Sequence, residues 1–130
     1  MVRRRPLLAL PAACLLAAGC HSHTAPPATA EDVEAARQDA AHELAQARVE
    51  ASKDVRSAVK EGGSTAQLAH AKAVAAYDLA MVKADGDHKI ATEKCLTQPV
   101  AELQSCREQA DADYEAAKAN AKLARMARQQ

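Results

Sequence analysis

Apolar side chains recur in steps of three and four along three successive segments, and this spacing constrains the fold more than any other feature. The first and longest series has steps of 3, 4, 4, 3, 4, 4 and 3. Steps of this kind place side chains on one face of an α-helix. The three series are Val33, Ala36, Ala40, Leu44, Ala47, Ala51, Val55 and Ala58; then Leu68, Ala71, Ala75, Leu79, Val82, Gly86 and Ile90; then Leu103, Cys106, Ala110, Tyr114, Ala117 and Ala121.

These series predict an all-α protein with helices at about residues 31–61, 65–96 and 99–128. About a quarter of the residues are alanine, and the chain has no Phe or Trp and two Tyr. A core of such small side chains buries little apolar surface for a chain of this length. We therefore expect an extended, alanine-rich helical hairpin or three-helix bundle, with close helix contacts or an oligomeric seam. The alternative is that alanine, the best helix former, produces the spacing by chance.

Residues that end or begin helices separate the three segments. Gly62-Gly63 is a typical helix stop, and Pro99 suits a first helical turn. Gly86 lies inside the second segment, where glycine costs about 1 kcal/mol relative to alanine, so a kink or break is expected there. The predicted caps are Thr29 for the first helix, Ser64 with Gln67 for the second, and Thr97 or Gln98 for the third.

Residues 1–19 have the three parts of a secretory signal. Arg3-Arg4-Arg5 is followed by an apolar run over residues 7–18 and by small residues up to Gly19. The run is shorter than the roughly 20 residues that a membrane-spanning helix needs. We predict a cleaved signal peptide.

Cys20 follows the signal directly, in Ala17-Ala18-Gly19-Cys20. This segment resembles the lipobox of bacterial lipoproteins, although Leu16 lies one position earlier than the leucine of that family. The resemblance implies a lipoprotein signal peptide over residues 1–19, lipidation of Cys20, and anchoring of the chain to a membrane. Residues 20–30 would be the anchor and a flexible tether. The alternative is cleavage after Ala30, which ends an A-x-A site.

Cys95 and Cys106 are the remaining pair once Cys14 is removed with the signal and Cys20 is lipidated. An even pair in an oxidising compartment predicts a disulfide, which would close a loop and join the second helix to the third. The predicted turn at residues 98–99 places the two cysteines at different heights. The turn must therefore be centred later, near Val100-Ala101, or the helix ends must unwind.

No catalytic, metal or cofactor site is predicted. The spacing of Cys95 and Cys106 fits neither a structural zinc site nor a C-x-x-C redox motif. His21 and His23 suit a polar linker better than a weak metal site. Loss of the three arginines leaves 14 basic and 17 acidic side chains, and this slight excess of negative charge does not indicate a surface that binds nucleic acid. A small-molecule substrate is not expected either.

Two parts of the chain resemble known envelope proteins. The elements "ATEKC", "AELQSC" and "ADADYEAAKANAK" are similar to small uncharacterised proteobacterial envelope proteins, which implies a periplasmic hairpin held by two cysteines. The segment "GCHSHTAPPATAEDVEAARQDAAHELAQARVEA" resembles alanine-zipper outer-membrane lipoproteins. That family ends in a lysine joined to peptidoglycan, whereas this chain ends Arg128-Gln129-Gln130, so covalent attachment to the cell wall is not expected.

The sequence thus predicts a lipid-anchored envelope protein that faces the periplasm, with a structural or protein-interaction role and no enzyme activity. In the enterobacterial lipoproteins that this segment resembles, Asp directly after the lipidated cysteine favours the inner membrane, so the resemblance implies the outer membrane for a chain with His21 there. Its expected partners are the membrane, reached through the lipid, and either a second copy or another envelope protein. The alternative function is that of a soluble periplasmic binding or chaperone-like protein.

Overall fold

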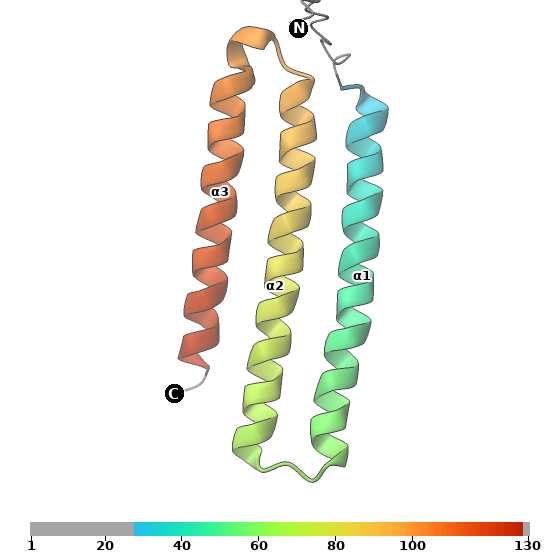
Figure 1. Ribbon diagram of the computed structural model, residues 1–130, viewed down its shortest axis with the longest axis vertical. Coiled ribbons are helices and arrows are strands. Elements are labelled where there is room, and N and C mark those ends of the chain that lie inside the picture. The colour runs from blue at the N-terminus through green and yellow to red at the C-terminus, as the bar shows by residue number, and fades with distance from the viewer. Residues whose placement is uncertain (1–27, 129–130) are drawn as a thin grey trace, which may run out of the picture.

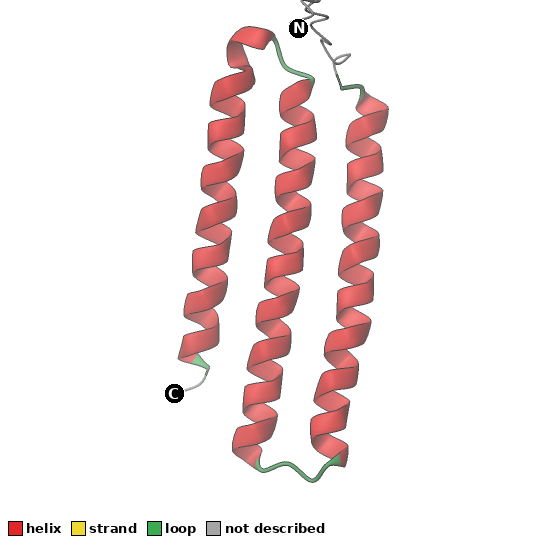
Figure 2. Ribbon diagram, in the orientation of Figure 1, coloured by secondary structure: helices red, strands yellow, loops and turns green. Residues whose placement is uncertain are grey.

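The computed structural model describes residues 28–128, which form three helices joined by two short loops (Figure 2). They are α1 (Ala30–Lys60), α2 (Thr65–Leu96) and α3 (Val100–Ala127). No strand occurs in this part of the chain. The all-α prediction is confirmed, and each helix end lies within one residue of the predicted position.

The helices lie side by side with α2 in the middle and with successive helices antiparallel (Figure 1). Helix α2 packs against both neighbours, whereas no Cα atom of α1 comes within 8 Å of one in α3. At about 1.5 Å per residue, the 31 residues of α1 span roughly 46 Å. The arrangement is thus an open layer of three helices, in which each outer helix contacts α2 alone.

Helix α2 can serve two neighbours because it carries small side chains on two opposite sides. The predicted series from Leu68 to Ile90 faces α1. A second series, which sequence reasoning missed, faces α3 and contains Ala73, Tyr77, Ala84, His88, Ala91 and Cys95. Its steps of 4, 7, 4, 3 and 4 are again helical, and they place it about half a turn from the first series.

The most buried side chains are small. The buried apolar residues are Val33, Ala36, Ala73, Ala75, Ala84, Cys95, Ala110 and Ala121. Larger side chains such as Leu44, Val55, Leu79 and Ile90 are only half-buried. Small residues at a helix contact allow the backbones to approach closely, but they bury little apolar surface. The helices therefore pack closely along each seam but bury little apolar surface there, as the composition predicted.

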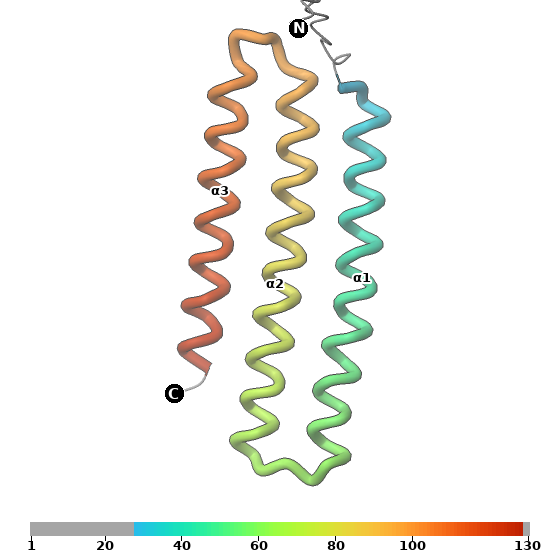
Figure 3. Tube along the Cα trace, viewed as in Figure 1, coloured from blue at the N-terminus to red at the C-terminus, as the bar shows by residue number. Residues whose placement is uncertain are grey.

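Gly86 lies at the closest approach of α1 and α2. A Cβ atom added at this position would lie 2.8 Å from the Cβ of Ala40. The break considered at Gly86 is absent, since the Cα trace of α2 continues without interruption (Figure 3). The physical reason is that Gly86 supplies room for α1, and the packing it permits keeps the helix intact.

Two of the predicted caps are present. The Thr29 Oγ1 accepts a hydrogen bond from the Asp32 N–H, and the Thr29 N–H donates to Asp32 Oδ2. Ser64 and Gln67 make the same reciprocal pair at the start of α2. The preceding loop turns at Gly62, whose φ of 68° is in the left-handed region that favours glycine.

The predicted cap of α3 is wrong. The N-cap of α3 is Pro99, which is extended and whose side chain cannot accept a hydrogen bond. Only its backbone carbonyl takes part in the cap, where it accepts a hydrogen bond from the Glu102 N–H at 2.8 Å. Thr97 is unavailable because it ends α2: its hydroxyl donates to the carbonyl oxygen of Lys94 at 2.8 Å.

The packing at Gly86 makes a prediction about stability. Replacing an interior helical glycine by alanine usually stabilises a helix by about 1 kcal/mol, but overpacking a tight contact costs about 1–3 kcal/mol. We expect Gly86→Ala to lower the free energy of unfolding by about 1–2 kcal/mol, measured by urea denaturation. Adding Ala40→Gly should recover part of the loss in a double-mutant cycle, whereas a stabilising Gly86→Ala would contradict the assigned contact.

Candidate functional site

The predicted site residues fall in two places. Cys20, the signal peptide at residues 1–19 and most of the tether lie outside the described residues. Cys95 and Cys106 lie at the end of the layer where α2 ends and α3 begins. Their Sγ atoms are bonded, with the Cα atoms 5.5 Å apart, so the predicted disulfide is confirmed.

The first turn of α3 resolves the predicted difference in height between the two cysteines. The chain rises beyond the end of α2, and the start of α3 arches over this end before the helix descends (Figure 1). Val100, in this arch, is 89% exposed. The loop itself spans residues 97–99 and both helix ends are intact, so neither of the two alternatives describes it; α3 instead begins beyond the end of α2, and Cys106 comes level with the buried Cys95.

A cluster of polar side chains joins α2 to α3 farther along their seam. The His88 Nε2 lies 2.7 Å from Asp111 Oδ1, and the His88 ring stacks on the Tyr114 ring with centroids 4.7 Å apart. The Tyr114 hydroxyl donates to Asp85 Oδ1 at 2.5 Å. Two side chains of each helix therefore meet in one continuous contact.

Two cations of α3 complete the aromatic contacts of this seam. The Lys118 ammonium lies 4.7 Å from the centroid of the Tyr114 ring, and the Arg125 guanidinium lies 5.1 Å from that of Tyr77. Such cation–π contacts contribute about 0.5–1 kcal/mol at exposed sites. The contact of Arg125 with Tyr77 joins α3 to α2, as the disulfide does, whereas Lys118 and Tyr114 both belong to α3.

The hydrogen bond to Asp85 and, less strongly, burial and the charge of that carboxylate raise the pKa of Tyr114 above its ordinary value. Among residues 28–128, no hydrogen bond links His88 to a Ser, Thr or Cys, and no group of three His, Cys, Asp or Glu could hold a metal ion. What this arrangement can do is fasten two helices.

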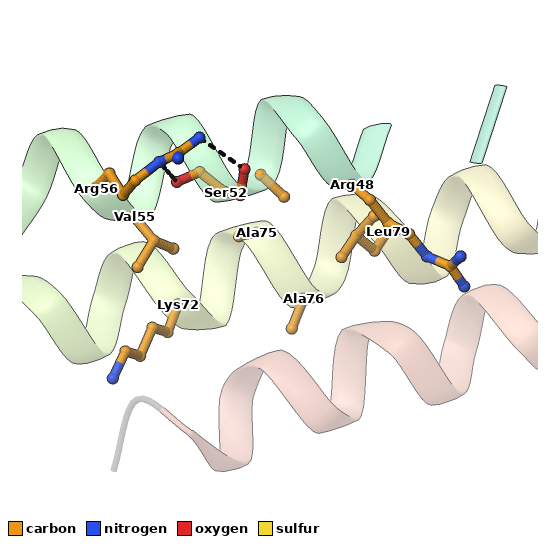
Figure 4. Close-up of a pocket in the computed structure, with 9 residues that line it drawn as sticks. Arg48, Ser52, Val55, Arg56, Lys72, Ala75, Ala76 and Leu79 are labelled. Carbon is orange, nitrogen blue, oxygen red and sulfur yellow. Dashed lines mark hydrogen bonds between the residues drawn. The ribbon is translucent and has the colours of Figure 1, made fainter. Parts of the chain in front are cut away.

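Hollows lie along both seams, but their lining differs. The hollows between α2 and α3, of about 270 and 390 Å³, include the carboxylates of Asp85, Asp87, Glu93 and Asp113, whereas those between α1 and α2 are mainly apolar and basic. One hollow along the α1–α2 seam measures about 470 Å³; Val55 and Leu79 lie between the two helices there (Figure 4), and Ala75 and Ala76 also line it. Its remaining lining residues are Arg48, Ala51, Ser52, Arg56 and Lys72. The floor is apolar, and all of the charged lining residues are basic.

A second hollow of about 280 Å³ continues this groove along the same seam. Its lining residues are Arg37, Ala40, Ala41, Leu44, Val82, Lys83, Gly86, Asp87 and Ile90. Asp87 is the single carboxylate that lines either hollow, and it is paired with Lys83 at 2.5 Å. Arg37 is paired with Glu34. We call the two hollows together the α1–α2 groove.

Three cations of the α1–α2 groove are not neutralised. Arg48, Arg56 and Lys72 form no ion pair with any carboxylate of residues 28–128. Arg56 instead donates to the carbonyl oxygen and hydroxyl of Ser52, both at 3.1 Å. The positive charge at the rim therefore faces solvent.

Five of the seven acidic residues of α1 lie on its opposite edge. Asp32, Asp39, Glu43, Glu50 and Asp54 are spaced by 7, 4, 7 and 4, which places them on one side of the helix, and none of them lines the groove. On that side, Lys89 of α2 bonds Glu43 at 3.0 Å, and this bond raises the pKa of Lys89. Most of the acidic residues of α1 therefore lie away from the groove and its cations.

No known protein-family model matches the chain, and no curated protein or solved structure was found to resemble it. None of the helices within residues 28–128 is both long and apolar enough to cross a bilayer. The site is therefore interpreted from its own residues.

Sequence reasoning found the disulfide but missed the polar cluster and the charged groove. The cluster was hidden because His88 and Tyr77 interrupt an otherwise alanine series on α2. The groove had a readable signal, since Arg37, Arg48 and Arg56 lie on a different edge of the helix from five of its seven acidic residues.

The disulfide makes a prediction about the order of unfolding. Closing a loop of this size stabilises a protein by about 3 kcal/mol in the chain-entropy model. We expect reduction, or Cys95→Ala with Cys106→Ala, to lower the free energy of unfolding by about that amount. Because α3 contacts α2 alone, hydrogen exchange should increase more in residues 100–127 than in residues 30–60; an equal increase in both would contradict the open layer.

The contact of Tyr114 with Asp85 makes a prediction about pH. A raised pKa in the folded state means that this stabilisation is complete below the ordinary tyrosine pKa of about 10 and is lost as the pH rises through the folded-state value. In a Tyr77→Phe background, absorbance at 295 nm should show Tyr114 ionising at higher pH in the folded than in the unfolded chain.

Asp85→Asn should lower the midpoint of this titration, because it removes the carboxylate that disfavours the phenolate. The matched control is Asp87→Asn, whose carboxylate is bonded to Lys83 instead, and it should leave the midpoint unchanged. Equal shifts in the two variants would contradict the assigned hydrogen bond.

Proposed function

We propose that this chain is a bacterial cell-envelope lipoprotein with a structural or protein-interaction role. Cys20 carries the lipid, residues 20–30 are the tether, and the helical layer projects into the periplasm, with the outer membrane as the expected location. No catalytic activity is part of the proposal. The α1–α2 groove carries the interaction role, because it leaves an apolar floor and unpaired cations accessible along a helical seam.

The disulfide supports a place outside the cytosol. Disulfides form and persist in oxidising compartments such as the periplasm and are rare in the cytosol. Here the bond joins Cys95 to Cys106 at a seam whose buried side chains are mostly alanine. A bond that contributes to holding such a thin seam fits an exported protein.

The first helix supports lipidation at Cys20 over the alternative of cleavage after Ala30. Cleavage there would remove Thr29, whose side chain and backbone form the reciprocal cap with Asp32. Loss of an N-cap costs about 0.5–2 kcal/mol. Cleavage before Cys20 leaves this cap intact, together with residues that can act as a tether.

The second candidate function is a soluble periplasmic binding or chaperone-like protein. The same groove favours it, since an apolar floor with a charged rim suits client segments as well as one fixed partner. The two functions differ in the mature N-terminus, which an intact-mass measurement of the exported protein distinguishes.

Metabolic labelling with a clickable fatty acid tests the anchor. We expect the wild-type chain to incorporate the label and Cys20→Ala to lose it, because Cys20 is the acceptor. Cys14→Ala is the matched control, as Cys14 lies in the signal and should not affect labelling. Wild-type protein without label, or Cys20→Ala with equal label, would exclude lipidation at Cys20.

A further inference from the structure

We propose that the α1–α2 groove binds an amphipathic helix of a periplasmic protein, with an apolar stripe flanked by Asp or Glu residues. This inference rests on the proposed function and names the kind of partner. Four features of the groove support this inference: its length, its apolar floor, the positive charge of its rim and its position in the layer.

The groove has the length and shape of a helix-binding site. Along α1 it extends from Arg37 to Arg56, which at about 1.5 Å per residue is roughly 28 Å. It is straight because both helices that form it are uninterrupted. A partner helix of about 19 residues would lie along it as a third helix packed against this face of the pair, since α3 occupies the opposite side of α2.

The floor favours a helix over an extended peptide. Leu44, Val55 and Leu79 are half-buried and face a groove with no free backbone donors or acceptors, because α1 and α2 satisfy their own. An extended peptide gains most from pairing with a sheet edge, and no strand occurs in residues 28–128. A helix satisfies its own backbone and brings apolar side chains at steps of three and four.

The positive charge at the rim of the groove favours a partner helix with acidic residues beside its apolar stripe. Arg48 and Arg56 come from α1 and Lys72 from α2 (Figure 4), and all three are exposed and form no ion pair within the described chain. Carboxylates beside the apolar stripe of a partner would meet these cations, whereas Lys or Arg there would be repelled.

A second copy of this chain fits the groove poorly. The apolar series of α1, α2 and α3 are already used in the seams between them. The exposed apolar residues at the end of α3, Leu123 and Met126, stand beside Lys122 and Arg125, so this end would bring cations to cations.

The groove lies away from the end of the layer at which the chain would be anchored through Cys20. Ala30 begins α1 at the end of the layer where the disulfide lies, and Gly62 lies at the far end (Figure 1). Arg48 is 18 residues beyond Ala30, or about 27 Å along the helix. The cations therefore stand away from the anchored end, where soluble envelope proteins are accessible.

Two synthetic 19-residue peptides test this inference. Both carry the same Leu and Ala stripe at helical spacing; one has Glu and the other Lys at the flanking positions. We expect fluorescence anisotropy with the full exported protein to show the Glu peptide binding about tenfold more tightly or better, with the advantage shrinking as salt rises. Photo-crosslinks from the Glu peptide should fall in residues 37–56 and 72–90.

Charge reversal gives the matched comparison. Arg48→Glu, Arg56→Glu and Lys72→Glu together should reverse the preference, so that the Lys peptide binds more tightly. Lys53→Glu, Lys60→Glu and Lys122→Glu change the same number of exposed cations outside the groove and should keep the preference for Glu. Circular dichroism confirms that both triple variants remain helical.

Three results would overturn the inference: equal binding of the two peptides, crosslinks on the α2–α3 seam, or self-association of the wild type that the groove variant abolishes. The last would assign the groove to a second copy. None of these results changes the labelling of Cys20, so failure of this inference is distinguishable from failure of the proposed anchor.

Discussion

The size of the side chains on α2 is the constraint on which the other features depend. Ala75 and Gly86 face α1, while Ala73 and Ala84 face α3, and all four are buried. These small residues let two helices approach the same helix from opposite sides. Because the outer helices are then held apart by the full width of α2, no closed interior forms, and each seam must be stabilised separately.

The two seams are stabilised in different ways. The α2–α3 seam combines alanine contacts with the disulfide and with the cluster around Tyr114, so its polar groups are already engaged with one another. The α1–α2 seam relies on Gly86 against Ala40 and on half-buried leucine and valine side chains. This difference explains why the accessible apolar surface with free cations lies between α1 and α2.

The helices and their ends could be predicted because spacing, caps and glycine stops act locally. The pairing of Cys95 with Cys106 followed from the number of cysteines. The open layer could not be predicted, since spacing tells which residues share a face but not which helix covers it. The second face of α2 was hidden because Tyr77, His88 and Cys95 break its apolar pattern, and Gly86 was misjudged because propensity alone ignores a neighbouring helix.

The shared position of α2 also bears on how such a sequence can change over time. Each seam behaves as a nearest-neighbour unit, as in repeat proteins, so substitutions in α1 and in α3 are sterically independent of one another. A residue of α2 such as Ala84 or Gly86 must instead be small enough for the outer helix that it contacts, and it belongs to a helix that packs against the other outer helix as well. The outer helices are therefore free to diverge in charge and length, whereas the middle helix is held to small residues on both sides.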